Sequence, residues 1–299
     1  MKRIGVFFGM GFAIVNLGVT RLEAQDLPFV IQYNFNSMTT NTGPLDPTPV
    51  PTAQGVVFGS FSAVGYSGTS ALDKKFSWSG NDLGGIISST NWADFTGSLN
   101  EARYFEVTFT PRAGYALDLS TISFGFNRYD QGVRNYAVRS SLDEFAENLP
   151  ARINPATPDL AVLPDNSFFW VRDEANPTDH RQNEVDLSAE FTGLASPVTF
   201  RFYGWNAEES RGLFTIDNVI VTGGAVPVPE PGALAMLALG TVLFGLGCHR
   251  RFACRGARKR GRFTSVRAYQ SPGRPILASK PWPSTRRGPG GCHGSPPRS

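Results

Sequence analysis

Hydrophobic and polar residues alternate along most of residues 28–223, with the period of two that is typical of half-buried β-strands. Phe105, Val107 and Phe109 alternate with polar side chains, and the same pattern recurs around Phe124 and Phe200. β-Branched and aromatic residues fill these runs, while Gly, Asn, Asp and Ser separate them. The predicted strands cover residues 29–35, 56–64, 105–109, 122–126, 135–140, 167–172, 183–187, 198–203 and 213–222.

Nine short strands without any segment of helical period predict an all-β fold, an antiparallel β-sandwich over residues 25–224. Two Pro-rich stretches, 42–52 and 149–166, are expected to be long loops, because proline cannot donate to a sheet ladder. One short helix is expected around residues 141–148, where Ser141 would be the N-cap and Glu144 follows three residues later.

The N-terminal residues 1–24 have the pattern of a secretory signal peptide. Lys2 and Arg3 precede an apolar stretch over residues 4–19, and Ala24 offers a small residue for cleavage before Gln25. An uncleaved N-terminal anchor is the alternative, although the apolar stretch is shorter than a usual membrane span. Residues 1–24 therefore predict export.

A second membrane signal follows the predicted sandwich, in residues 225–251. Val228, Pro229, Glu230 and Pro231 are followed by 16 uncharged residues, 232–247, and then by a basic pair, Arg250–Arg251. As a helix, 16 residues would be about 24 Å long, which is barely enough to cross a bilayer. The arrangement predicts a single transmembrane helix with the arginines on the cytoplasmic side and the sandwich outside.

This order of motif, apolar stretch and basic pair resembles the C-terminal signal of bacterial PEP-CTERM proteins. The resemblance implies that Pro229, Glu230 and Pro231 are recognised by exosortase, a membrane-embedded processing enzyme. It further implies an exported protein of a Gram-negative bacterium that makes exopolysaccharide and biofilm. The alternative is an ordinary single-span anchor behind a Pro-rich stalk.

The residues beyond the arginines, 252–299, depart from that pattern. Residues 248–299 carry 13 basic and no acidic side chains, whereas residues 25–225 carry 12 basic and 23 acidic ones, a formal charge of −11. The composition of residues 252–299 predicts disorder. The segment is interpreted either as a basic arm that binds lipid or nucleic acid or as an accidental extension of the chain, and we favour the extension. A metal site is a weaker alternative, on Cys248, His249, Cys292 and His293. The acidic sandwich itself is not expected to bind nucleic acid.

Two segments of the body resemble exported jelly-roll domains, residues 136–145 and 214–219. In some carbohydrate-binding sandwiches the aspartate that matches Asp217 helps to hold calcium, so the resemblance makes Asp217 a candidate calcium ligand. The alternative role is a carboxylate bonded to backbone amides. No other cofactor is expected.

A sugar-binding face is expected on one strand of the sandwich. Arg201, Tyr203 and Trp205 lie on the face opposite to Phe200 and Phe202. If Phe200 faces the core, the three side chains form a solvent-facing patch on which a pyranose ring can stack.

Catalysis is the third hypothesis. Glycoside hydrolysis needs two carboxylates at a fixed separation, and neighbouring acids in predicted loops rarely converge. These acids are the pairs Asp143–Glu144, Asp173–Glu174 and Glu208–Glu209, and the nearby His180 is expected at the surface. The favoured interpretation is an exported, non-catalytic envelope or exopolysaccharide-matrix protein; a surface carbohydrate-binding module or adhesin comes second, and a secreted glycan-active enzyme last.

Overall fold

The computed structural model describes residues 25–66, 72–85, 89–129, 131–173, 176–187 and 189–228. The predicted signal peptide, transmembrane helix and basic tail lie outside these residues. The described residues form thirteen strands and three 3-10 turns, η1 (Trp92–Asp94), η2 (Ser141–Asp143) and η3 (Ala189–Phe191). The strands are β1 (Leu27–Tyr33), β2 (Val56–Phe58), β3 (Ser62–Val64), β4 (Phe76–Ser79), β5 (Tyr104–Pro111), β6 (Tyr115–Arg128), β7 (Asn135–Ser140), β8 (Ala151–Ile153), β9 (Leu160–Val162), β10 (Phe168–Trp170), β11 (Asn176–Asp186), β12 (Val198–Trp205) and β13 (Leu213–Pro227).

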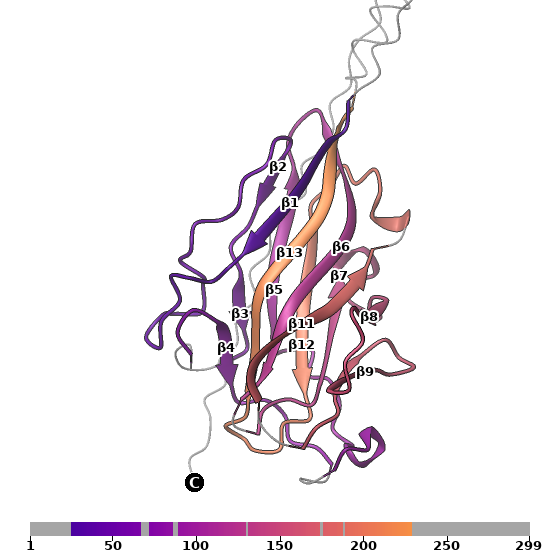
Figure 1. Cartoon of the computed structure of the whole chain (residues 1–299). Coiled ribbons are helices and arrows are strands. Elements are labelled where there is room, and N and C mark those ends of the chain that lie inside the picture. Colours follow the sequence, from indigo (N-terminus) through magenta and orange to yellow (C-terminus); the bar gives the residue numbers. More distant parts are fainter. Residues whose placement is uncertain are drawn as a thin grey trace, which may run out of the picture. The chain divides into compact units, whose positions relative to one another are not determined.

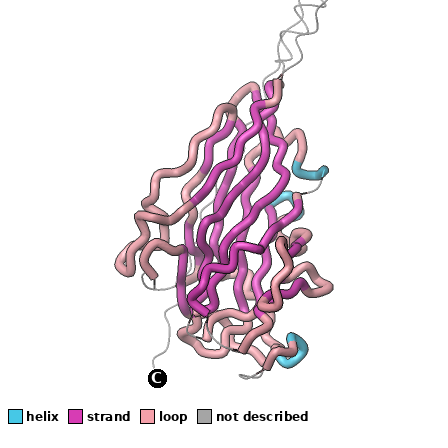
Figure 2. Tube along the Cα trace, viewed as in Figure 1, coloured by secondary structure: helices cyan, strands magenta, loops and turns pink. Residues whose placement is uncertain are grey.

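The strands pair into two antiparallel sheets, so the predicted sandwich is confirmed (Figure 1). The first sheet has the order β1-β13-β6-β11-β8, and β4 joins β13 alongside its first residues. The second sheet has the order β2-β5-β12-β7-β10-β9, and β3 also pairs with β5. Strands form the central part of the body, and loops and short helical turns surround them (Figure 2).

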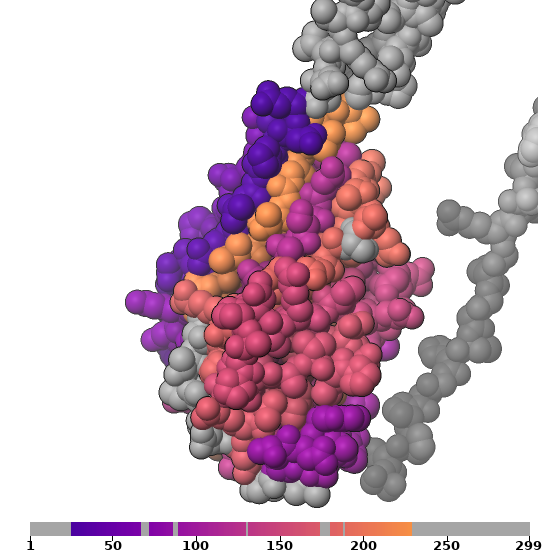
Figure 3. Space-filling view, turned by 45° about the vertical axis from the view of Figure 1, so that its right-hand side comes forward, coloured from indigo at the N-terminus to yellow at the C-terminus, as the bar shows by residue number. Residues whose placement is uncertain are grey.

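The chain enters and leaves the sandwich at the same end. Leu27, the first residue of β1, is the register partner of Ala225, close to the end of β13. The turn η1 lies at the opposite end, and its surroundings cover that end of the domain in the space-filling view (Figures 2 and 3). The point where the chain leaves the sandwich and the loops that connect β4 to β5 and β12 to β13 therefore lie at opposite ends of the domain.

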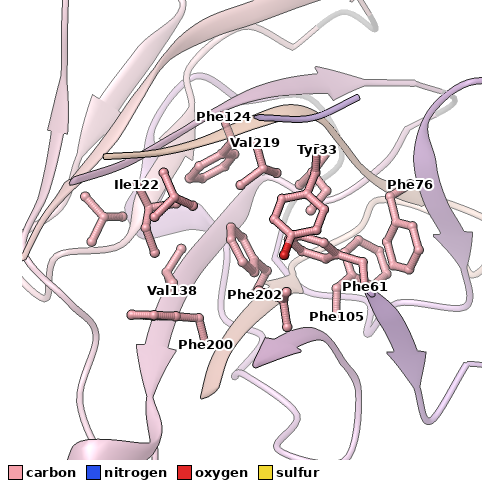
Figure 4. Close-up of a cluster of buried hydrophobic side chains, with 14 of the residues drawn as sticks. Tyr33, Phe61, Phe76, Phe105, Ile122, Phe124, Val138, Phe200, Phe202 and Val219 are labelled. Carbon is pink, nitrogen blue, oxygen red and sulfur yellow. The ribbon is translucent and has the colours of Figure 1, made fainter. Parts of the chain in front are cut away.

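Aromatic side chains fill the space between the sheets (Figure 4). Phe124 from one sheet packs edge to face against Phe202 from the other, with ring centroids 5.3 Å apart. Phe105 and Phe214 stack across the sandwich at 4.6 Å. Phe200 is fully buried, so the alternation in the sequence identified the inward face of β12 correctly.

Three short strands were not predicted, β4, β8 and β9. In β4 the polar residue Ser77 is buried like its apolar neighbours, so the strand lacks a clear alternation. The Ser77 hydroxyl lies 2.7 Å from that of Thr215. β8 and β9 lie in the Pro-rich stretch 149–166 and pair on one side only, at the margins of the two sheets. Proline is tolerated at sheet edges, so the exclusion of this stretch from the sheet centres is confirmed, but its description as a loop was wrong.

The expected helix at residues 141–148 was also largely wrong. It is reduced to η2, and the N-cap is Ser140, whose side chain accepts the Leu142 N–H. Glu144 takes a left-handed conformation at the C-cap, with φ of 61°, so it cannot reach back as a capping-box partner.

Candidate functional site: the exit of the last strand

The last strand remains paired where the predicted sorting residues begin. β13 pairs with β1 as far as Ala225 and with β6 as far as Pro227. The Val228 N–H then donates to the Gly114 carbonyl at 2.8 Å. Val228 is about half exposed, at 47%. The folded sandwich therefore continues up to Val228, and no linker separates it from the first predicted sorting residue.

A proline inside this strand is compatible with the ladder. In an antiparallel pair, successive residues direct their N–H groups alternately toward and away from the same neighbour. Because Val228 donates to Gly114, directly before β6, Pro227 occupies a position whose missing N–H would have pointed away from β6. Proline at such a position costs no hydrogen bond to β6 and leaves the outer edge of the strand without a donor.

The other predicted sorting residues lie outside the described part of the chain. These are Pro229, Glu230, Pro231, Arg250 and Arg251. Within the described ranges, no helix is long and apolar enough to cross a membrane.

The predicted sugar-binding residues occupy the expected face of β12, but the expectation that they face solvent was wrong. Tyr203 is 1% exposed and Trp205 is 6% exposed. They form a small second hydrophobic cluster with Ala137, against which Leu99 and Tyr104 pack. Because the chain before β5 folds over this face, two of the three side chains are unavailable for stacking on a sugar.

Arg201, the third residue of the proposed patch, is held between two aromatic rings. Its guanidinium carbon lies 3.9 Å from the centroid of Tyr104 and 3.8 Å from that of Phe145. Its Nε is 3.2 Å from Glu106. Burial raises the pKa of the Tyr203 hydroxyl, and the neighbouring Arg201 opposes that rise. The three residues thus form a packed polar and aromatic layer on the outside of the sheet.

Asp217, the candidate calcium ligand, lies in β13 and is largely buried. One carboxylate oxygen accepts the Asn218 N–H at 2.8 Å, and the other lies 3.8 Å from the Lys75 ammonium. No group of three or more His, Cys, Asp or Glu side chains in the described ranges is arranged to hold a metal ion. The contacts match the alternative role, a carboxylate bonded to the backbone, and Lys75 supplies a positive charge where a cation would bind.

The predicted acid pairs do not share one environment. The Asp143 carboxylate caps a turn, accepting from the N–H groups of Phe145 and Glu147. Glu208 lies in a loop as predicted, but it is buried. Its Oε1 lies 2.5 Å from Nη1 of Arg134 and 2.7 Å from Nη2 of Arg128, both fully buried arginines.

This buried cluster joins three connections at the end of the sandwich away from the chain's exit. Arg134 also donates to the carbonyls of Trp170 and Ser89, at 2.9 and 2.5 Å. Burial lowers the pKa of Arg128, and the adjacent Glu208 partly offsets that effect. Glu208 is 74 positions from Arg134, and the three charged residues sit in loops or at strand ends, so no local pattern marks them.

His180 is likewise buried, at 7% exposure, and not at the surface as expected. Its ring packs edge-on against Trp170 with centroids 4.8 Å apart, and its Nδ1 lies 3.8 Å from Asp159. The bulged strand β11 carries it inward, which the polar residues around it did not indicate.

Comparison with known protein families finds a match to the PEP-CTERM protein-sorting motif over residues 227–251. The search of the curated proteins and that of the solved structures gave no match. The matched motif begins at Pro227, inside β13. It indicates a protein that is exported, held in the membrane as a precursor and recognised by exosortase. The chain therefore carries a PEP-CTERM sorting motif that begins at the end of its β-sandwich.

Proposed function

We propose that the protein is a non-catalytic component of the cell envelope or of the exopolysaccharide matrix of a Gram-negative bacterium. The observation that carries the proposal is the position of the sorting motif, which begins in the last strand of the sandwich. Export begins at the signal peptide, the apolar segment halts it, and exosortase processing then determines the final place of the sandwich. The function of the sandwich is to be displayed at the surface or in the matrix.

The contacts of the acidic side chains support a non-catalytic sandwich. Glu208 is neutralised between two arginines, and Asp143 caps a turn. A general acid or nucleophile must face its substrate, and neither carboxylate is available for that. The formal charge of −11 over residues 25–225 favours a soluble, well-hydrated domain in the matrix.

The proposal is tested by replacing Pro229, Glu230 and Pro231 with alanine in the native host. Membrane, surface and matrix fractions are then probed for the sandwich. We expect the wild-type protein in the surface or matrix fraction and the triple variant in the membrane fraction. A matched control replaces two exposed prolines of the body, Pro47 and Pro49, and is expected to fractionate as the wild type. Wild-type localisation of the triple variant would overturn the proposal.

Carbohydrate binding remains a second candidate, because one tryptophan is exposed in a suitable place. Trp92 is 50% exposed on η1, at the end of the sandwich opposite the chain's exit. The same connection between β4 and β5 lines a depression of about 660 Å³ with polar side chains such as Thr96, Ser98 and Asn100. Trp92 does not itself line this depression, but both belong to the same connection, and a pyranose ring binds by stacking on an aromatic ring and by hydrogen bonds to hydroxyl and amide groups.

Affinity electrophoresis in the host's own polysaccharide tests this candidate. We expect retention that is lost in Trp92→Ala and kept in Leu142→Ala, a control with a comparably exposed side chain of 42%. Equal mobility of the wild type and Trp92→Ala would exclude Trp92 as a binding residue.

A further inference from the structure

The chain leaves the sandwich very close to the predicted membrane segment. Val228 is tied to Gly114 by a hydrogen bond, and only three residues separate it from Gly232, where the uncharged stretch begins. Four Cα–Cα steps reach at most about 14 Å, even when fully extended. An enzyme that binds Pro229, Glu230 and Pro231 therefore works within that distance of the folded domain.

The surface beside this exit is the turn between β5 and β6. We call residues 112–115 and 226–228 together the exit face. The turn is fixed at both ends, since the Arg112 N–H donates to Gly55 at 2.9 Å and the Tyr115 N–H donates to Arg112 at 3.0 Å. Residues 112–114 are exposed. The exit face is thus a rigid, accessible surface, with only a methyl group at Ala113 and no side chain at Gly114.

Little of β13 can be released to move the motif away from this surface. Ala225 is fully buried and is paired on both sides, with Leu27 of β1 and Leu117 of β6. Separating Ala225 or any earlier residue of β13 from its neighbours would expose the core. At most three residues, 226–228, can therefore separate from β6. They would add about 11 Å of reach, at 3.6 Å per residue.

We propose that the membrane-embedded processing enzyme contacts the exit face of the folded sandwich while it binds the sorting motif. The inference rests on the proposed function, because it assumes that exosortase processes this chain. The enzyme cannot treat the motif as the end of a free tail. It also gains no backbone donor from Pro227 on the outer edge of β13, so recognition there uses carbonyl groups and prolyl packing instead of strand addition.

Processing is measured by pulse-chase labelling of the full chain in the native host. Ala113→Trp places a bulky side chain on the exit face, and Ala93→Trp, its control, does so at an exposed position of η1 at the other end. We expect Ala113→Trp to slow processing by about tenfold, equivalent to a steric cost of about 1.4 kcal/mol where the enzyme meets the exit face. We expect Ala93→Trp to be processed at the wild-type rate.

A spacer distinguishes steric exclusion of the enzyme from misfolding of the domain. Six residues of Gly and Ser inserted after Val228 extend the reach by up to about 20 Å and should restore processing of Ala113→Trp. Wild-type processing of Ala113→Trp without the spacer would overturn the proposal, as would slow processing that the spacer does not relieve. If the wild type is not processed at all, sorting itself fails, and the proposed function is refuted first.

A disulfide tests whether the motif is bound on the closed sandwich. Val226 and Ala116 are register partners in an antiparallel pair, so their Cα atoms are about 5.5 Å apart, within disulfide range. The pair Val226→Cys and Ala116→Cys is made with Cys248, Cys254 and Cys292 replaced by serine. We expect the crosslinked chain to be processed at the rate of the same variant after reduction. Processing that stops until the disulfide is reduced would contradict binding on the closed sandwich.

Discussion

Removing the negative charge of Glu208 tests the buried ion cluster. Glu208→Gln keeps the shape of the side chain and leaves Arg128 and Arg134 without their shared carboxylate. Both arginines are fully buried, and their nitrogens lie 2.7 and 2.5 Å from the same oxygen. The nearby Asp173 carboxylate, 3.4 Å from Arg134 and 42% exposed, can replace only part of the interaction.

The expected loss is large for a single substitution. Breaking a buried ion pair by removing one partner costs about 3–5 kcal/mol, and the glutamine oxygen still accepts a hydrogen bond, so we expect about 3 kcal/mol. For a domain of about 200 residues, each kcal/mol lowers Tm by about 2–4 °C, which gives a decrease of about 6–12 °C.

The assay is thermal and denaturant unfolding of the purified exported protein, followed by circular dichroism. Glu209→Gln is the matched control, because this neighbouring carboxylate is exposed, and it should change the free energy of unfolding by less than about 0.5 kcal/mol. Equal stability of the two variants would refute the claim that Glu208 compensates two buried charges.

Two further substitutions test packing and electrostatics elsewhere in the domain. Gly204→Ala should destabilise the fold by about 1–3 kcal/mol through overpacking, since a Cβ would lie 2.7 Å from the Phe214 ring; Gly43→Ala, with open space around it, should not. Partial burial raises the pKa of Glu184, but hydrogen bonds from Arg152 and a neighbouring amide together with the Arg152 charge outweigh that effect and lower it overall. Such a carboxylate stabilises the fold above its ordinary pKa of 4.5 and loses that contribution as the pH falls through its folded value. Glu184→Gln should therefore be less stable than the wild type at pH 7 in chemical unfolding, and the difference should shrink as the pH is lowered below 4.5; a pH-independent difference would contradict this assignment.

The alternation of side chains was sufficient to predict the sandwich and the inward face of its strands. Phe200 and Phe202 face the core as expected, because period two fixes which residues share a face. The same period places Tyr203 and Trp205 on the outward face but carries no information on the chain before β5, which folds over that face. Burial of an outer face depends on loops, and loop paths have no periodic signal.

The charged cluster could not be predicted, for a related reason. Glu208 and Arg134 are 74 positions apart and meet only because two connections converge at one end of the sandwich. Short strands such as β8 and β9, of three residues each, also escape a pattern search. In contrast, the sorting residues follow one another in the chain, so the sequence alone was enough to recognise their motif.

The most direct test of the central claim is mass spectrometry of the mature protein from the native host, with both termini identified. Our account predicts a chain that begins near Gln25 and ends near Glu230, a sandwich freed from its signal peptide, membrane segment and basic tail. A mature chain that still extends to Ser299 would contradict exosortase processing and leave a simple membrane anchor.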